Sequence, residues 1–184
     1  MIVTELEDER LFPDIPLNLD SPVPNRRKGT NMNSSNMLSR QGHRLLQIGV
    51  GLFLFASLEG FVVEYLPVPR LGLSIHTLSV IEGLTLLGLG LLWTKLNLGA
   101  TASRIAFWLF VYSAFATLVP YVLAAVWGAG SSTIPLAAGA ARGSAVQETI
   151  IMVVLYSAAP AVLISLVLIL WGLRMADGQS NDGK

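Results

Sequence analysis

Hydrophobic and polar positions divide the chain into a polar beginning, four long apolar stretches and a short polar end. Each apolar stretch reaches the roughly 20 residues that cross the hydrocarbon core of a bilayer. Each is also longer and more uniformly apolar than an amphipathic helix of a soluble protein. The pattern predicts an all-α integral membrane protein, a four-helix bundle, with spans over residues 45–66, 73–94, 104–128 and 148–173.

The polar ends are expected to lie outside this bundle, which we place at residues 41–175. Residues 1–40 are rich in Asp, Glu, Asn, Ser and Pro, and such a composition favours a disordered tail. A shorter polar tail is predicted over residues 176–184. No apolar core follows a basic N-terminal region, so we do not expect a secretory signal.

Composition supports the membrane assignment and excludes several kinds of site. Hydrophobic residues make up 53% of the chain and charged residues 13%, about half the charged fraction of a soluble domain. The net charge is zero, and no basic block indicates nucleic acid. Cysteine is absent, which excludes disulfides, iron–sulfur clusters and thiolate metal sites.

Basic residues near the span ends predict the orientation. Arginine and lysine concentrate in cytoplasmic loops, and most of those near the spans would share one side, namely Arg40, Arg44, Lys95, Arg104 and Arg174. The other side carries Arg70 and Arg142. We therefore expect both termini in the cytoplasm.

Ionisable residues in or beside the spans are the candidates for chemistry, because each costs roughly 2.5–3.5 kcal/mol to insert into a membrane. The topology places them all in the outer half of the bundle, and they are Glu59, Glu64, His76, Glu82 and Glu148. Glu64 has an equally good interpretation as a solvated interface residue. Glu148 has one as a charge favoured at a helix N-terminus.

Glu82 is the hardest of these to explain without function, since it lies about two turns deeper than His76. A carboxyl at that depth is expected to stay protonated at neutral pH, as a general acid must. Its offset of six residues from His76 puts the two side chains about 120° apart on a helix. Gln147, Tyr121 and Trp127 lie at the same outer level as possible substrate contacts, although interfacial aromatic residues more often belong to a membrane belt.

The two histidines, His43 and His76, fall on opposite sides of the membrane. They cannot share a metal ion or a bis-histidine haem within one chain. A single histidine with an open opposite position is still possible, and this geometry suits a haem iron that acts on a ligand.

The connection over residues 128–143 is long, rich in small residues and almost uncharged. It fits either a re-entrant lid over a site or an ordinary external loop. Pro120 interrupts the third span just before Tyr121, and a kink there could help to open a pocket.

An ordered set of short segments resembles the bacterial hydroxylaminobenzene mutase family over about residues 40–174. The segments begin at Arg40 (RQGHRLLQ), Pro69 (PRLGLSIH), Ala124 (AAVWGAG), Pro135 (PLAAG), Gln147 (QE) and Leu170 (LWGLR). A more distant similarity is to membrane styrene oxide isomerases, which are four-helix proteins that assemble as trimers and carry haem b.

The resemblance implies an isomerase that converts an aryl hydroxylamine such as hydroxylaminobenzene to 2-aminophenol. It also implies a location in the bacterial cell membrane, a homotrimer, and haem b on His76, which matches the histidine ligand by position. Tyr121 matches the substrate-side tyrosine of the isomerases. Glu82 replaces their polar amide, which puts a direct transfer of epoxide chemistry in doubt.

These observations lead to a hypothesis in which haem iron on His76 or a protonated Glu82 weakens the N–O bond. Glu59 or Glu148 would stabilise the positive charge that develops, and Tyr121 and Trp127 would hold the ring. The alternatives are an epoxide isomerase, a small membrane transporter and a structural subunit. The transporter ranks lower because no internal repeat is evident.

Overall fold

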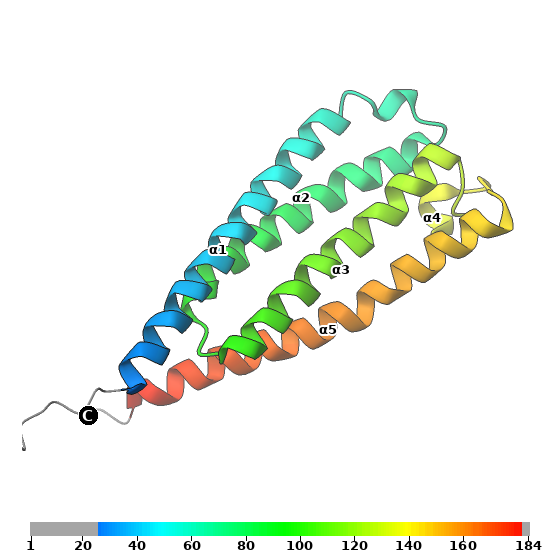
Figure 1. Cartoon of the computed structure of the whole chain (residues 1–184). Coiled ribbons are helices and arrows are strands. Elements are labelled where there is room, and N and C mark those ends of the chain that lie inside the picture. The colour runs from blue at the N-terminus through cyan, green and yellow to red at the C-terminus, as the bar shows by residue number, and fades with distance from the viewer. Residues whose placement is uncertain (1–25, 182–184) are drawn as a thin grey trace, which may run out of the picture.

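The computed structural model describes the backbone of residues 26–181 and the side chains of residues 36–174. The described chain is helical and contains no strand. Four long helices run side by side, and both described ends of the chain lie at the same end of the bundle (Figure 1). These helices are α1 (Arg26–Glu59), α2 (Pro69–Leu92), α3 (Ala100–Trp127) and α5 (Ala145–Asn181). The predicted all-α four-helix fold is therefore confirmed.

Three short helical elements complete the connections. The 3₁₀ helix η1 (Val63–Tyr65) joins α1 to α2, and η2 (Trp93–Lys95) ends α2. A single turn, α4 (Pro135–Ala138), lies in the connection from α3 to α5. We call the end of the bundle that carries η1 and α4 the α4 end, and the opposite one the basic end.

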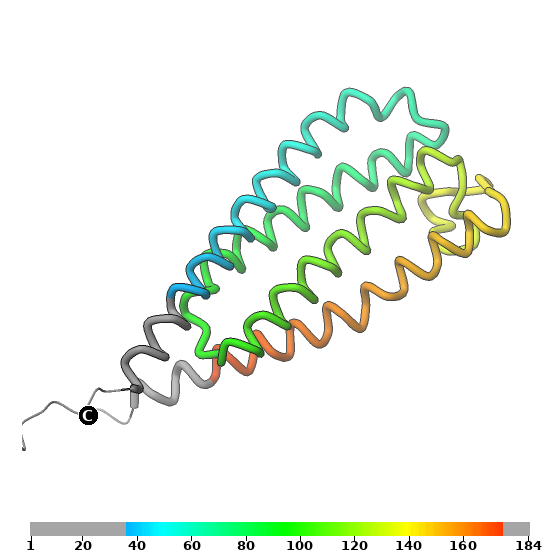
Figure 2. Tube along the Cα trace, viewed as in Figure 1, coloured from blue at the N-terminus to red at the C-terminus, as the bar shows by residue number. Residues whose placement is uncertain are grey.

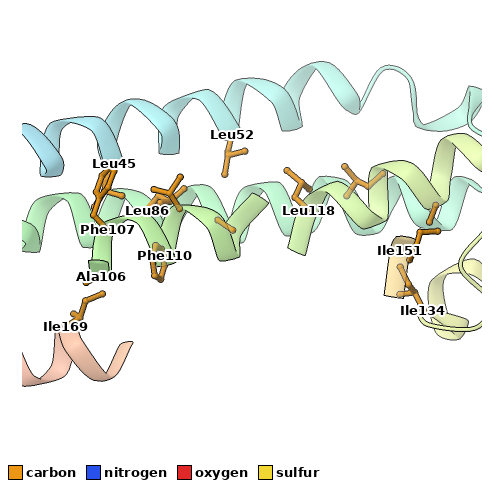
Figure 3. Close-up of a cluster of buried hydrophobic side chains, with 14 of the residues drawn as sticks. Leu45, Leu52, Leu86, Ala106, Phe107, Phe110, Leu118, Ile134, Ile151 and Ile169 are labelled. Atoms are coloured by element: carbon orange, nitrogen blue, oxygen red, sulfur yellow. The ribbon is translucent and has the colours of Figure 1, made fainter. Parts of the chain in front are cut away.

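The helices form two hairpins, one of α1 with α2 and one of α3 with α5. The two hairpins contact each other mainly through α2 and α3. The hairpins can be followed along the chain trace in Figure 2. Large apolar side chains fill the space between them, and Figure 3 shows Leu45, Leu52 and Leu86 from one hairpin with Phe107 and Phe110 from the other. Many other large apolar side chains are exposed, including Leu84, Val153 and Leu163. This exposure is what a lipid solvent requires.

The first hairpin is held together by backbone contact at glycines. A Cβ atom placed on Gly42 would lie 2.8 Å from the carbonyl oxygen of Gly90, and one placed on Gly49 would lie 2.9 Å from that of Gly83. The reverse distances, from Gly90 to Gly42 and from Gly83 to Gly49, are 2.9 Å and 3.0 Å. Small residues permit this close approach in membrane helix pairs.

Three helices are long and apolar enough to span a membrane, over Pro69–Lys95, Ala100–Trp127 and Ala145–Arg174. The helix α1 is a weaker candidate for a membrane span. Its apolar stretch, from Leu45 to the end of the helix at Glu59, covers only about 22 Å, and the polar residues His43 and Arg44 precede this stretch. Together with the apolar exterior, these helices make the chain a membrane protein.

The predicted first span, residues 45–66, is too long. The helix ends at Glu59, and Gly60 donates to the Ala56 carbonyl at 3.0 Å. Leu66 is extended, at φ −76° and ψ 145°, because the residue before a proline disfavours helix and Pro67 follows. Glu64 therefore lies exposed in η1 and outside the helix, in agreement with its interpretation as a solvated residue.

The tails also differ from expectation where they are described. Residues 26–40, predicted within the disordered tail, belong to α1. At the other end α5 continues to Asn181, into the predicted polar tail at 176–184. Residues 1–25 and 182–184 lie outside the described residues.

Candidate functional site

The end of α1 meets the second turn of α2 at a histidine–carboxylate pair. His76 Nδ1 lies 3.0 Å from the carbonyl oxygen of Ala56 and 3.7 Å from Oε2 of Glu59. A carbonyl only accepts hydrogen bonds, so Nδ1 must donate. The neutral imidazole then carries its lone pair on Nε2, which leaves this nitrogen free to bind a proton or a metal.

Gly72 makes room for the Glu59 carboxyl. A Cβ atom at position 72 would lie 3.3 Å from Glu59 Oε1 and 2.8 Å from Leu66. Both carboxyl oxygens are buried without a hydrogen-bond partner in the described chain, and the side chain is 8% exposed. An unsatisfied buried carboxyl is costly, and the neighbouring His76 is the described group that compensates part of this cost.

A cavity of about 600 Å³ opens at the α4 end between α2, α3 and the α4 turn. Its polar lining comes from Arg70, Ser74, Thr77, Tyr121 and Thr133. Its apolar lining comes from Leu73, Leu78, Ile134, Pro135, Leu136 and Ala137. Binding sites for small molecules have this size and this mostly apolar character with a few polar groups.

The connection between α3 and α5 is folded back onto the bundle by Glu148. Its Oε1 accepts hydrogen bonds from the backbone N–H groups of Gly130 at 2.8 Å and Gly143 at 3.0 Å, and Oε2 accepts one from Ser132 at 3.2 Å. The side chain is buried. The carboxylate thus fixes both ends of the segment whose residues 133–137 wall the cavity. The connection therefore lies against the bundle and forms one wall of the cavity.

Gln147 serves the start of α5. Its Oε1 accepts from the backbone N–H of Ser144 at 2.8 Å, while its own N–H donates to Ser144 Oγ at 3.3 Å. This reciprocal arrangement is a capping box, which satisfies two free backbone donors at a helix start. The predicted substrate contact through Gln147 has no support in this geometry.

The third helix ends close to the cavity. Gly128 adopts the left-handed conformation at φ 63°, and the N–H of Ala129 donates to the Ala124 carbonyl at 2.9 Å. Pro120 is buried within α3 and Tyr121 after it lines the cavity. Trp127 is half-buried and does not line this cavity.

Glu82 lies near the middle of α2, partly buried, with no hydrogen bond or ion pair to other described residues. It follows Leu78 by one helical turn on the same face, and Leu78 lines the cavity. His76 turns instead toward α1. The prediction that His76 and Glu82 occupy different faces agrees with this arrangement.

The predicted convergence of ionisable groups is only partly realised. The structure brings Glu59 to His76. The Glu148 carboxylate, from the first turn of α5, bonds instead to the connecting segment, Glu82 lies along α2, and Tyr121 lines the cavity. Within the described residues, no group of three or more histidine and acidic side chains could hold a metal ion.

Sequence reasoning missed part of the cavity wall. Arg70 was expected only to mark the orientation of the chain in the membrane, and Ser74 and Thr77 were not among the candidate site residues. Their spacing of three to four residues along α2 places them on one side of the helix, and this was the available signal. Thr133 carried no such signal, because the backbone bonds to Glu148 decide where it lies.

Comparison with known proteins agrees with the geometry of a small-molecule site in a membrane bundle. The styrene oxide isomerase family model matches residues 41–174. Hydroxylaminobenzene mutase HabB of Ectopseudomonas oleovorans is 44% identical over 138 residues, which covers 75% of this chain and 84% of that protein. Hydroxylaminobenzene mutase HabA of the same organism is 33% identical over 129 residues, or 70% of this chain and 96% of that protein. No solved structure shows a significant match. The chain therefore belongs to the styrene oxide isomerase family and shares most of its length with two hydroxylaminobenzene mutases.

Proposed function

We propose that this protein is a membrane isomerase that converts an aryl hydroxylamine to a 2-aminophenol by moving the hydroxyl group within one molecule. The observation that carries the proposal is the 44% identity to hydroxylaminobenzene mutase HabB over 138 residues. The cavity of about 600 Å³ beside Tyr121 supports it, because a single substituted ring fits in such a volume.

The reaction breaks the N–O bond and forms a C–O bond at the ring carbon next to the one that carries nitrogen. That carbon loses its proton and the nitrogen gains one, the oxygen returns the proton that it received on leaving, and the overall formula is unchanged. No oxidant or reductant is consumed. The main requirement is to protonate the departing oxygen and keep bulk water away from the ring cation while oxygen returns.

In this proposal the substrate enters from the lipid and its ring lies against Leu78, Ile134 and Tyr121 in the cavity. Glu82, one turn deeper, is the general acid that protonates the hydroxylamine oxygen. The absence of a described partner leaves its carboxyl free for this role. Glu148 then acts by holding the cavity wall, since its oxygens are already engaged by three backbone donors.

His76 is the proposed ligand of haem b. Its Nδ1 is held by the Ala56 carbonyl, and a histidine that ligates a metal typically donates its other N–H in this way. Haem iron would supply a Lewis acid when bound. The imidazole is 42% exposed, so this chain alone does not enclose a group on Nε2. We therefore also propose a homotrimer, in which another copy covers that surface.

The proposed location is the bacterial cell membrane, with both termini in the cytoplasm. The basic end carries Arg40, Arg44, Lys95, Arg104 and Arg174, whereas the α4 end carries Arg70 and Arg142. Such a bias is the usual signature of the cytoplasmic side.

The experiment is an assay of the detergent-purified protein with phenylhydroxylamine and with styrene oxide in parallel. We expect 2-aminophenol from the first substrate, at least a hundredfold loss in Glu82→Gln, and near wild-type activity in Thr85→Ala. Thr85 is an exposed α2 residue whose side chain bonds only to the Ile81 carbonyl. Full activity of Glu82→Gln would refute the proposal that Glu82 is the general acid. An absorption spectrum of the purified protein without a Soret band would refute the proposal that it binds haem.

A second candidate function is isomerisation of an epoxide to an aldehyde, which the family match over residues 41–174 favours. It predicts turnover of styrene oxide and none of phenylhydroxylamine in the same assay.

A further inference from the structure

Three arginines surround one hollow at the basic end of the bundle, far from the proposed catalytic residues. The hollow has a volume of about 190 Å³. Arg40 and Arg44 reach it from α1 and Arg104 from α3. Met37, Gln41, Phe107 and Trp108 complete its lining. No acidic side chain takes part.

The arginines have no counter-charge within the described chain. Arg40 and Arg44 are four residues apart on α1, and two like charges at this spacing repel each other. None of the three forms an ion pair with a described residue. The described glutamates are Glu59, Glu64, Glu82 and Glu148, and none of these lines the hollow.

The remaining polar group of the hollow is also a donor. The Gln41 side chain is 8% exposed, and its Oε1 accepts from Trp93 Nε1 at 3.1 Å and from Ser103 Oγ at 2.6 Å. Indole N–H can only donate, so the amide oxygen is fixed on the side of Trp93. The amide NH₂ must then point the other way, and Gln41 lines the hollow. Guanidinium and amide donors together demand an anion.

The level of the hollow in the bundle indicates which anion. Arg44 immediately precedes the apolar stretch that begins at Leu45, and Arg104 lies in the second turn of α3, whose candidate span begins at Ala100. Trp108 follows Arg104 by one turn and is 58% exposed. Arginine above an exposed tryptophan is the arrangement of a membrane interface, where lipid headgroups lie.

We propose that this hollow binds the phosphate of an anionic phospholipid, with the three guanidinium groups and the Gln41 amide as donors and Trp108 beside the acyl chains. Basic pockets between membrane helices bind acidic headgroups in this way. The site is separate from the proposed catalytic residues and does not depend on the reaction that they perform.

The test uses the full chain, freed of lipid in a neutral detergent and titrated with phosphatidylglycerol while native mass spectrometry counts the bound lipid. We expect each of Arg40→Gln, Arg44→Gln and Arg104→Gln to weaken binding about fivefold, the effect of one basic residue at an anionic surface. The triple variant should bind at least tenfold more weakly. Lys95→Gln removes the same charge from the same end outside the hollow and should change binding less than twofold.

Phosphatidylcholine and inorganic phosphate are the two comparison ligands. Equal binding of phosphatidylcholine, or unchanged binding in the triple variant, would overturn the proposal. If inorganic phosphate displaces phosphatidylglycerol at equal concentration, the ligand is a soluble anion and the proposal of a lipid ligand is overturned. Circular dichroism of each variant separates loss of binding from loss of fold, and the single variants decide if the triple variant does not fold.

Discussion

Gly90→Ala tests how tightly the first hairpin is packed. A Cβ atom at position 90 would lie 2.9 Å from the carbonyl oxygen of Gly42 and 2.9 Å from Leu46 Cγ. The first of these neighbours is backbone, so it can yield only if α1 and α2 move apart. Overpacking of this kind typically costs about 1–3 kcal/mol.

The matched control is Gly88→Ala, two residues earlier on the same helix. A Cβ atom there meets no other atom within 4 Å. Both substitutions gain the same helix propensity of about 0.5–1 kcal/mol. The overpacking cost should therefore appear as the difference between the two variants, with Gly88→Ala more stable than the wild type and Gly90→Ala less stable.

The measurement is the free energy of unfolding in mixed micelles titrated with sodium dodecyl sulfate, followed by far-ultraviolet circular dichroism. A Gly90→Ala protein at least as stable as Gly88→Ala would refute the reasoning, because it would show that α1 and α2 do not touch through their backbones. The result also bears on the site, since the same hairpin places Ala56 and Glu59 against His76.

Three further predictions concern single polar side chains. Glu148→Ala leaves three backbone N–H groups without their acceptor and should lower the stability of the connection between α3 and α5 by about 1–3 kcal/mol. We expect faster proteolysis of this connection, and proteolysis as slow as in the wild type would contradict the role of Glu148. Ser165→Ala removes the 2.8 Å hydrogen bond to the Ala106 carbonyl between α5 and α3 and should lower the free energy of unfolding by about 0.5–1.5 kcal/mol, while Thr149→Ala, whose hydroxyl bonds within its own helix, should change it much less. Glu82→Leu should keep or raise the free energy of unfolding because it removes an unpartnered carboxyl from an apolar span, yet it should abolish mutase activity; a large loss of stability would instead indicate a structural role.

The candidate site was predictable from the sequence only in part. The cost of a charge among apolar residues marked Glu59, His76 and Glu82 without any knowledge of the fold. The partners of these residues were not visible in the same way. Glu59 touches His76 because α1 ends at Glu59 and Gly72 leaves room for the carboxyl, and both facts depend on how the hairpin closes.

Glu148 shows the same limit from the other direction. A carboxylate at a helix start fits either a charge for catalysis or a favourable pole for the helix dipole. The structure uses it for a third purpose, as the acceptor for the N–H groups of Gly130, Ser132 and Gly143. Loop backbone has no side-chain pattern, so its hydrogen bonds cannot be read from residue types.

By itself, then, the sequence determined that the chain lies in lipid, that it forms four long helices, and which residues are expensive to bury. Apolar stretches of sufficient length leave a backbone in lipid no alternative to helix, and this holds whatever the helices contact. The tertiary structure alone decided where the first helix stops, which residues wall the cavity beside Tyr121, and that Arg40, Arg44 and Arg104 share one hollow. Those outcomes depend on distances between helices, which arise from packing at glycines such as Gly42 and Gly90 and not from the periodicity of any one segment.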